Sequence, residues 1–298
     1  GYGLPIGGVI ATDVNYGDNG GAISPGAVGF DINCGVRVLA LEATIDDIPN
    51  IKKLGGRIAG RIPAGASGKG GLDINMAGIG YDEDLAVLES NGLLEVEDND
   101  LSSRALERGL RALGTLGSGN HFMELQSVEQ IADQETAKQW GLYEGQLLAM
   151  IHSGSIGLGH QVCSEHSRKL EQKYRKTAEG WHSEEYGFTL SDRQLACAPM
   201  FSKAGQDYLN QMNAAANFAF ANRSALAHRL REVLKLEMGI DGEARTLYDV
   251  AHNIAKIETH NLNGKNCQCA VHRKGATRAF SGDSGHIEAS FQQTGQPV

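Results

Sequence analysis

The sequence predicts an α+β fold in one large mixed domain that spans residues 1–298. Three observations predict this class. Glycine-punctuated strands are expected near the start, helices towards the centre, and a β-rich last third. No internal repeat or low-complexity linker divides the chain, so one domain is favoured over two. The length and the 41% hydrophobic content suffice to bury a sizeable core.

Short strands are predicted in the first half of the chain. The first 30 residues hold nine glycines among short apolar pieces, a pattern typical of strands joined by tight turns. The apolar runs Arg37–Leu41 and Gln146–Ile151 predict two further strands. The second of these runs leads directly into His152.

Helices are predicted over residues 101–112, 163–178 and 203–237. Residues 246–257 and 267–280 are predicted to be β-rich. Cys267 and Cys269 have the wrong spacing for a zinc ribbon, so we assign them to strand packing. In the longest helix, apolar residues form a stripe close to helical spacing, as expected of a core-facing side: Leu209, Met212, Ala216, Phe220, Leu226 and Leu230.

The net charge of -9 argues against a surface coated with bases for non-specific nucleic-acid binding. Eight acids and no base fall in residues 82–100, which we interpret as a solvated face and a surface loop. The rest of the chain is nearly neutral and has room for a local basic groove. The cluster His272-Arg273-Lys274 with Arg278 is either a solvated strand end or a clamp for an anion or phosphodiester.

Cysteine usage and hydropathy predict a cytoplasmic protein without membrane association. The five cysteines form an odd, scattered set, which argues against a disulfide framework and favours a reducing compartment. No run approaches 18 apolar residues, and no signal-peptide pattern is visible. The chain starts with Gly1 in place of Met and stops at Val298 without a terminal element, so we expect it to be cut at both ends.

Three histidines share one local context, a strand end or a glycine-rich turn: His121, His152 and His252. Rigid scaffolds place functional side chains in such loops. Asp31 and Cys34 are three residues apart in a turn, and the glycine after the thiol would let carboxylate and thiolate converge. A mixed O, S and N ligand set suits Mn, Fe, Co or Zn. Five ligands exceed one tetrahedral zinc, which favours a dinuclear site built from strand-end loops. The alternative is a buried thiol and unrelated histidines.

The glycine-rich segment Gly114–Gly119 has two interpretations. Its backbone amides could bind phosphate, but it lacks the Lys-Ser/Thr pair of a P-loop, and a turn without a ligand is the alternative.

Six motifs follow one another along the chain: Gly3–Leu41 (GLPIGGVIATD … SPGAVGFDINCGVRVL), Leu113–Glu124 (LGTLGSGNHFME), Ile151–Gln161 (IHSGSIGLGHQ), Asn217–Arg223 (NFAFANR), Ala251–Glu258 (AHNIAKIE) and Val271–Phe280 (VHRKGATRAF). Together they resemble the RtcB family of RNA-splicing ligases over nearly the whole sequence. Several separate motifs in the right order are far more specific than any single pattern.

The resemblance implies a GTP- and Mn(II)-dependent ligase. It would join an RNA 3′-phosphate or 2′,3′-cyclic phosphate to a 5′-hydroxyl end, as in tRNA splicing and RNA repair, with an activating protein as a further partner. By that similarity two Mn(II) ions would be held, with the thiolate as bridge, by Asp31, Cys34, His121, His152 and His252. The implied guanylate site comprises Asn120, His121, Phe122, Met123, Glu124, His252 and Asn253. Arg273 and Lys274 would lie near the RNA phosphates.

The sequence departs from the family pattern in its catalytic histidine and at one arginine. The family's guanylylated histidine lies in a His-Gly-Ala-Gly-Arg motif that this sequence does not contain, so the catalytic nucleophile is unassigned. Ile156 occupies a position where the family usually has arginine. Two alternatives therefore stay open: a metal-dependent phosphoesterase or cyclic phosphodiesterase that uses the dinuclear centre alone, and a non-catalytic remnant that binds RNA ends.

Overall fold

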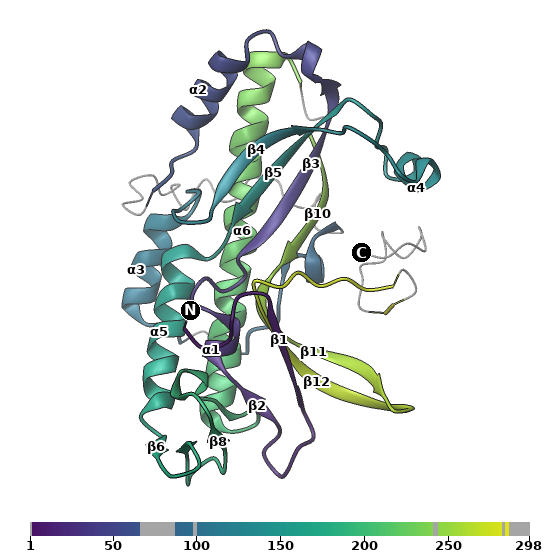
Figure 1. Ribbon diagram of the computed structural model, residues 1–298. Helices are drawn as coiled ribbons and strands as arrows, with labels where there is room; N and C mark the ends of the chain where they lie inside the picture. Colours follow the sequence, from purple (N-terminus) through teal and green to yellow (C-terminus); the bar gives the residue numbers. More distant parts are fainter. Residues whose placement is uncertain (1, 66–86, 98–99, 241–243, 282–283, 286–298) are drawn as a thin grey trace.

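A four-stranded antiparallel sheet lies at the centre of the molecule (Figure 1). In spatial order its strands are β10 (Arg245–Ala251), β3 (Gly35–Thr44), β5 (Gln146–Ser153) and β4 (Phe122–Ser127). The computed structural model describes residues 2–65, 87–97, 100–240, 244–281 and 284–285. The strands predicted at residues 37–41 and 146–151 lie inside β3 and β5 and are confirmed.

The long helix α6 (Lys203–Met238) packs against this sheet (Figure 1). It begins where the Ser202 hydroxyl accepts a hydrogen bond from the Gly205 amide, and it ends at Gly239 in the left-handed conformation. The helix predicted over 203–237 is therefore confirmed. The main core is formed by apolar side chains of the sheet and of the second half of α6, among them Leu39, Leu41, Ala149, Ile151, Leu226, Leu230 and Leu234.

The remaining helices surround α6 and the sheet. Their bounds are α1 (Pro25–Val28), α2 (Ile51–Arg61), α3 (Ser103–Ala112), α4 (Gln134–Gln139) and α5 (Ile156–Glu171), with 3-10 turns at Ile45–Asp47, Glu89–Gly92 and Arg193–Leu195. α5 contacts both α3 and α6 (Figure 1). The helix predicted over 101–112 is confirmed by α3. In the part of the chain that the structure describes, no helix is both long and apolar enough to cross a bilayer.

Three smaller sheets complete the fold. The largest is antiparallel, in the order β1 (Gly8–Asp13), β12 (Lys265–Lys274) and β11 (Asn253–Leu262). The others pair β2 (Ala22–Ile23) with β9 (Ala198–Pro199), and β6 (Arg175–Lys176), β7 (Trp181–His182) and β8 (Thr189–Leu190). The glycine-punctuated start and the β-rich last third are thus confirmed, although β12 ends at Lys274. The mixture of helices with antiparallel sheets confirms the α+β class.

The helix predicted over 163–178 is confirmed over residues 163–171, but its bounds were wrong, because α5 spans Ile156–Glu171. Glycines at its start allow close packing against neighbouring residues. A Cβ on Gly159 would lie 1.9 Å from the Ser155 hydroxyl oxygen, so only glycine fits there. At the other end, residues 175–176 form β6 instead of a helical turn.

The acidic run was only partly interpreted correctly. Residues 82–86 and 98–99 lie outside the described residues. Within the described part, Glu89 is 1% exposed and does not belong to a solvated face. Its Oε1 lies 2.7 Å from the Lys256 ammonium and 3.5 Å from Arg278 Nε, and its Oε2 accepts a hydrogen bond from the Ala251 amide. Burial raises the pKa of Glu89, but the two cations outweigh burial and hold it below its usual value.

Candidate metal centre and adjoining cavity

The structure brings the predicted ligands together at one end of the central sheet. Cys34 directly precedes β3 and His121 directly precedes β4, whereas His152 lies at the end of β5 and His252 follows β10. Since β5 is antiparallel to β3 and β4, and β10 is antiparallel to β3, two strand starts meet two strand ends here. The antiparallel order therefore makes four separate segments converge.

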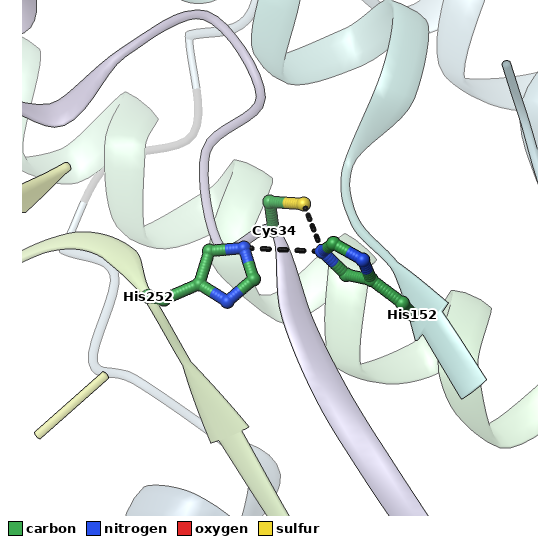
Figure 2. Close-up of side chains that lie close together, drawn as sticks. All are labelled: Cys34, His152 and His252. Atoms are coloured by element: carbon green, nitrogen blue, oxygen red, sulfur yellow. Dashed lines mark hydrogen bonds between the residues drawn. The ribbon is translucent and has the colours of Figure 1, made fainter. Parts of the chain in front are cut away.

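The ligand atoms form two groups of three that share the Cys34 sulfur: Asp31, Cys34 and His121, and Cys34, His152 and His252. Cys34 Sγ lies 3.3 Å from His121 Nε2 and 3.2 Å from His152 Nε2. His121 Nε2 is 2.7 Å from Asp31 Oδ2, and His152 Nε2 is 3.2 Å from His252 Nε2. Figure 2 shows the Cys34 thiol and the His252 ring both turned towards the His152 ring.

The separation between the His152 and His252 ring nitrogens fits two ligands of one metal ion. Two nitrogen ligands bound at about 2.1 Å to a tetrahedral ion lie about 3.4 Å apart, close to the observed His152–His252 separation. A shared sulfur would have to be a thiolate. Burial raises the pKa of the Cys34 thiol well above its usual value, and the Asp31 charge raises it further. A cation bound at this position would supply the charge that keeps the sulfur ionised.

The histidines offer ring nitrogens suited to a metal. Burial, and secondarily the neighbouring His152, lowers the pKa of His252 to about 4, so this ring is neutral near pH 7. Burial also lowers the pKa of His152. His121 Nδ1 lies 2.8 Å from the Leu116 carbonyl oxygen, so Nδ1 donates its proton there and Nε2 faces the sulfur. Burial alone would lower the pKa of His121, but Asp31 outweighs burial and raises it.

Local backbone geometry holds the Asp31–Cys34 turn. The Cys34 amide donates to the Asp31 carbonyl oxygen at 2.9 Å, and Asn33 has a φ of 53°, in the left-handed region that asparagine tolerates. The Asp31 carboxylate accepts a hydrogen bond of 2.7 Å from the amide of Ile156, the first residue of α5. The positive end of the helix thereby favours the ionised carboxylate.

Gly35 has a role that differs from the predicted one. A Cβ at this position would lie 2.5 Å from the Val250 carbonyl oxygen of β10. The glycine therefore allows β10 to approach β3 closely, and it is this approach that brings His252 to Cys34.

A cavity of about 480 Å³ adjoins the Asp31–His121 side of the centre. Its lining includes two arginines of α3, Arg108 and Arg111, and His160 of α5. Sequence analysis missed these three residues. A usable signal existed for the arginines, since a spacing of three places both on one face of a helix.

The remaining lining of the cavity comes largely from the glycine-rich segment and the start of α5: Ala112, Thr115, Ser118, Asn120, Ile156 and Gly157. Residues 114–119 thus border a cavity next to the metal ligands. Phosphate binding by this segment stays a prediction.

Three of the predicted guanylate residues lie in β4, on both of its faces. Phe122 and Glu124 are exposed, and the Phe122 ring packs edge-on against His152 with centroids 5.1 Å apart. Asn120 is also exposed and borders the cavity. Met123 points the other way and packs against the main core, so its side chain is not on the same face.

The Asn253 side chain forms hydrogen bonds to two other segments of the chain. Its Nδ2 donates to the Asp31 carbonyl oxygen at 3.0 Å, and its Oδ1 accepts from the Gly275 amide at 2.7 Å. It therefore ties the metal-ligand turn to the end of β12.

The basic cluster is neither a solvated strand end nor an open row of cations. Arg273 is buried, and its guanidinium forms a two-pronged ion pair with Glu258, with Nη2 donating to Oε2 at 3.0 Å. Lys274 is also buried and donates from its ammonium to the Tyr2 carbonyl oxygen. The solvated interpretation was wrong because both cations have partners distant in sequence. Contact of Arg273 and Lys274 with RNA stays a prediction.

Comparison with known proteins gives a consistent result. The model of the family described as tRNA-splicing ligase RtcB matches residues 1–298. The tRNA-splicing ligase RtcB of Archaeoglobus fulgidus is 43% identical over 319 residues, and that of Thermococcus kodakarensis is 42% identical; each alignment covers 100% of this chain and 64% of the relative. The RNA-splicing ligase RtcB of Mycobacterium tuberculosis is 43% identical, with 100% and 70% covered. The chain thus spans about two thirds of the length of these relatives.

Proposed function

Because this chain belongs to the RtcB family, we propose that it acts in RNA ligation and joins 3′-phosphate or 2′,3′-cyclic phosphate ends to 5′-hydroxyl ends, as in tRNA splicing. The observation that carries the proposal is the Cys34 thiol shared by two ligand groups, beside a cavity that contains two arginines. A centre of this kind suits chemistry in which two anions must be brought together.

We propose that the metal is Mn(II), two ions per chain, held by the five residues of the two ligand groups. When bound, the ions would polarise phosphate oxygens and offset their negative charge. The neutral His152 and His252 rings provide nitrogen ligands without a competing proton. Asp31, which is held by the Ile156 amide at the start of α5, adds a carboxylate ligand. Manganese prefers such oxygen ligands more strongly than zinc does.

The cavity beside Asp31 and His121 is the proposed site of the RNA phosphate. Arg108 carries a fixed positive charge there, and its Nη1 is held by Gln161 Oε1 at 3.0 Å. Because Ile156 lines the same cavity, this protein binds the phosphate with one guanidinium fewer than relatives that have arginine at this position.

GTP is the proposed nucleotide. Phe122 is 36% exposed next to the centre and offers an aromatic surface to a guanine base, with Asn120 and Glu124 on the same side. The proposed route passes through a guanylylated histidine, whose family motif this sequence does not contain. We therefore assign residues of this chain to the binding of metal, nucleotide and RNA phosphate, but we assign no residue as the nucleophile. Five free cysteines support a reducing, cytoplasmic location.

RNA-end binding tests the proposal. The purified protein is titrated with Mn(II) and then with labelled RNA that carries a 3′-phosphate, a 2′,3′-cyclic phosphate or a 3′-hydroxyl. We expect two Mn(II) ions per chain and tighter binding of the 3′-phosphate than of the 3′-hydroxyl, and only with metal. Equal affinity for all three ends would refute the proposal. Opening of the cyclic phosphate by protein and Mn(II) without GTP, with no binding of GTP, would favour a phosphoesterase instead.

A further inference from the structure

Two consecutive residues of α6, Asn222 and Arg223, lie beneath the candidate metal centre. Both are fully buried. They close the Asn217–Arg223 motif, for which neither the ligand set nor the cavity provides a role. Between them they contact each of the four chain segments that carry a ligand.

The Arg223 guanidinium binds three of these segments. Its Nη1 donates to the Asn33 carbonyl oxygen at 2.7 Å and to the Ser153 carbonyl oxygen at 3.0 Å, and its Nη2 donates to Asn33 Oδ1 at 3.0 Å. Nη2 and Nε also donate to the Asp249 carboxylate, at 2.6 and 2.9 Å. One rigid fork thus joins the turn before β3, the end of β5 and strand β10.

Two of the three partner residues of Arg223 are immediate chain neighbours of ligands. Asn33 directly precedes Cys34, and Ser153 directly follows His152. A displacement of either partner therefore moves a ligand by a similar amount. Lysine cannot replace this contact pattern, because an ammonium group lacks the planar set of five donors.

Asn222 holds the fourth segment. Its Oδ1 accepts from the Gly114 amide at 2.7 Å, and its Nδ2 lies 3.1 Å from the Thr115 carbonyl oxygen, both in the segment that leads to His121. The same Nδ2 lies 3.2 Å from Ser153 Oγ. The side chain therefore links the His121 segment to the end of β5.

We propose that Asn222 and Arg223 are positioning residues that set the distance between the two ligand groups, so that one thiolate serves both metal ions. This inference rests on the proposed metal centre. The hydrogen bonds of both residues go to neighbours of the ligands, so each residue acts through the backbone of three segments and through the Asp249 carboxylate of the fourth. Outer-shell residues of this kind hold the ligand geometry that a metal site requires.

The test is Arg223→Lys in the purified protein, with Arg231→Lys as the matched control. Arg231 is also an α6 arginine, but its Nε donates to the Ala244 carbonyl oxygen and its Nη2 to Thr246 Oγ1, at the far end of β10. Mn(II) affinity and stoichiometry are measured by calorimetry, and the Cys34–metal bond by the sulfur-to-metal absorption of the Co(II) form. Circular dichroism reports folding.

We expect Arg223→Lys to weaken Mn(II) binding by roughly 10- to 100-fold and to change the Co(II) absorption, while Arg231→Lys leaves both unchanged. Asn33→Gly is the second variant, because glycine accepts the φ of 53°. It removes the side-chain contacts of Asn33 to Arg223 and to the Ala216 carbonyl oxygen of α6, and keeps the backbone carbonyl that Arg223 also binds. It should change the Mn(II) affinity and the Co(II) absorption in the same direction as Arg223→Lys. If Arg223→Lys does not fold, Asn33→Gly tests the positioning role in its place. Parent-like metal binding in folded variants would overturn the positioning role alone. A parent protein that binds no Mn(II) would overturn the metal centre, and this inference with it.

Discussion

Replacing Cys34 by serine should eliminate both metal sites at once. The Cys34 sulfur is the one atom common to the two ligand groups, so the substitution leaves each with two protein ligands. A serine hydroxyl stays protonated near neutral pH and is a poor bridge between cations. Since loss of an outer-shell contact alone costs 10- to 100-fold in metal affinity, loss of the shared ligand should cost on the order of 100-fold or more.

The stability of the protein gives the magnitude of this effect. Mn(II) at 100 times its dissociation constant stabilises the parent by about 2.7 kcal/mol per site. For a chain of this size each kcal/mol raises the melting temperature by about 2 °C, so one occupied site gives a shift of roughly 5 °C. Cys34→Ser should show almost none of this shift, while its melting temperature without metal stays near that of the parent.

A second buried cysteine provides the control for this substitution. Cys163 is fully buried and lies 3.7 Å from the Pro25 carbonyl oxygen, in a different part of the core. Cys163→Ser should therefore lose some stability but keep the full Mn(II)-induced shift. If Cys34→Ser also keeps that shift, the thiol is not a ligand, and the interpretation as a buried free cysteine is correct.

Three further outcomes are expected. Because metal binding must displace the proton of the Cys34 thiol, whose pKa is raised by burial, Mn(II) affinity should rise by up to about tenfold per pH unit between pH 6 and 8, measured by calorimetry; a flat profile would contradict a thiolate ligand. Asp249→Asn removes the acidic partner that Arg37 and Arg223 share among the described residues. It should lower the free energy of unfolding, measured in urea without metal, by about 3–5 kcal/mol. Burial raises the pKa of Asp249, but both arginines outweigh burial and lower it. The ionised carboxylate therefore contributes its full stabilisation above the unfolded carboxyl pKa, and this stabilisation disappears as pH falls through the folded pKa. The variant should lose this acid dependence of stability. Ile156→Arg should strengthen binding of 3′-phosphate RNA by roughly tenfold or more, the value of a charged hydrogen bond, without affecting 3′-hydroxyl RNA in a binding assay.

The candidate ligands could be nominated from the sequence because each has a local signal. His121, His152 and His252 lie next to apolar strands or glycine turns, and Asp31 and Cys34 lie three residues apart. What the sequence could not supply was the strand pairing. Only the register of β5 with β3 and β4, together with that of β10 with β3, places the ligands at the same end of the sheet.

Charged residues were misjudged where the partner is far away in the chain. Glu89 lies in an acidic run and looked solvated, yet its partner Lys256 is 167 positions later and encloses it. Arg273 looked like an open cation, but Glu258 on the neighbouring strand neutralises it. Composition reports the charge of a segment, whereas burial depends on which opposite charge the fold brings to it.

The positioning residues had the weakest local signal of all. Asn222 and Arg223 lie in the middle of a long helix, among alanines and leucines, where a polar pair normally faces solvent. The fold buries them because three backbone segments present carbonyl and amide groups here that need partners, and because the Asp249 carboxylate of β10 needs a cation; two adjacent side chains satisfy all of them. Packing of α6 and ligand geometry are therefore coupled: a substitution that tilts this helix should change Mn(II) affinity without touching a single ligand.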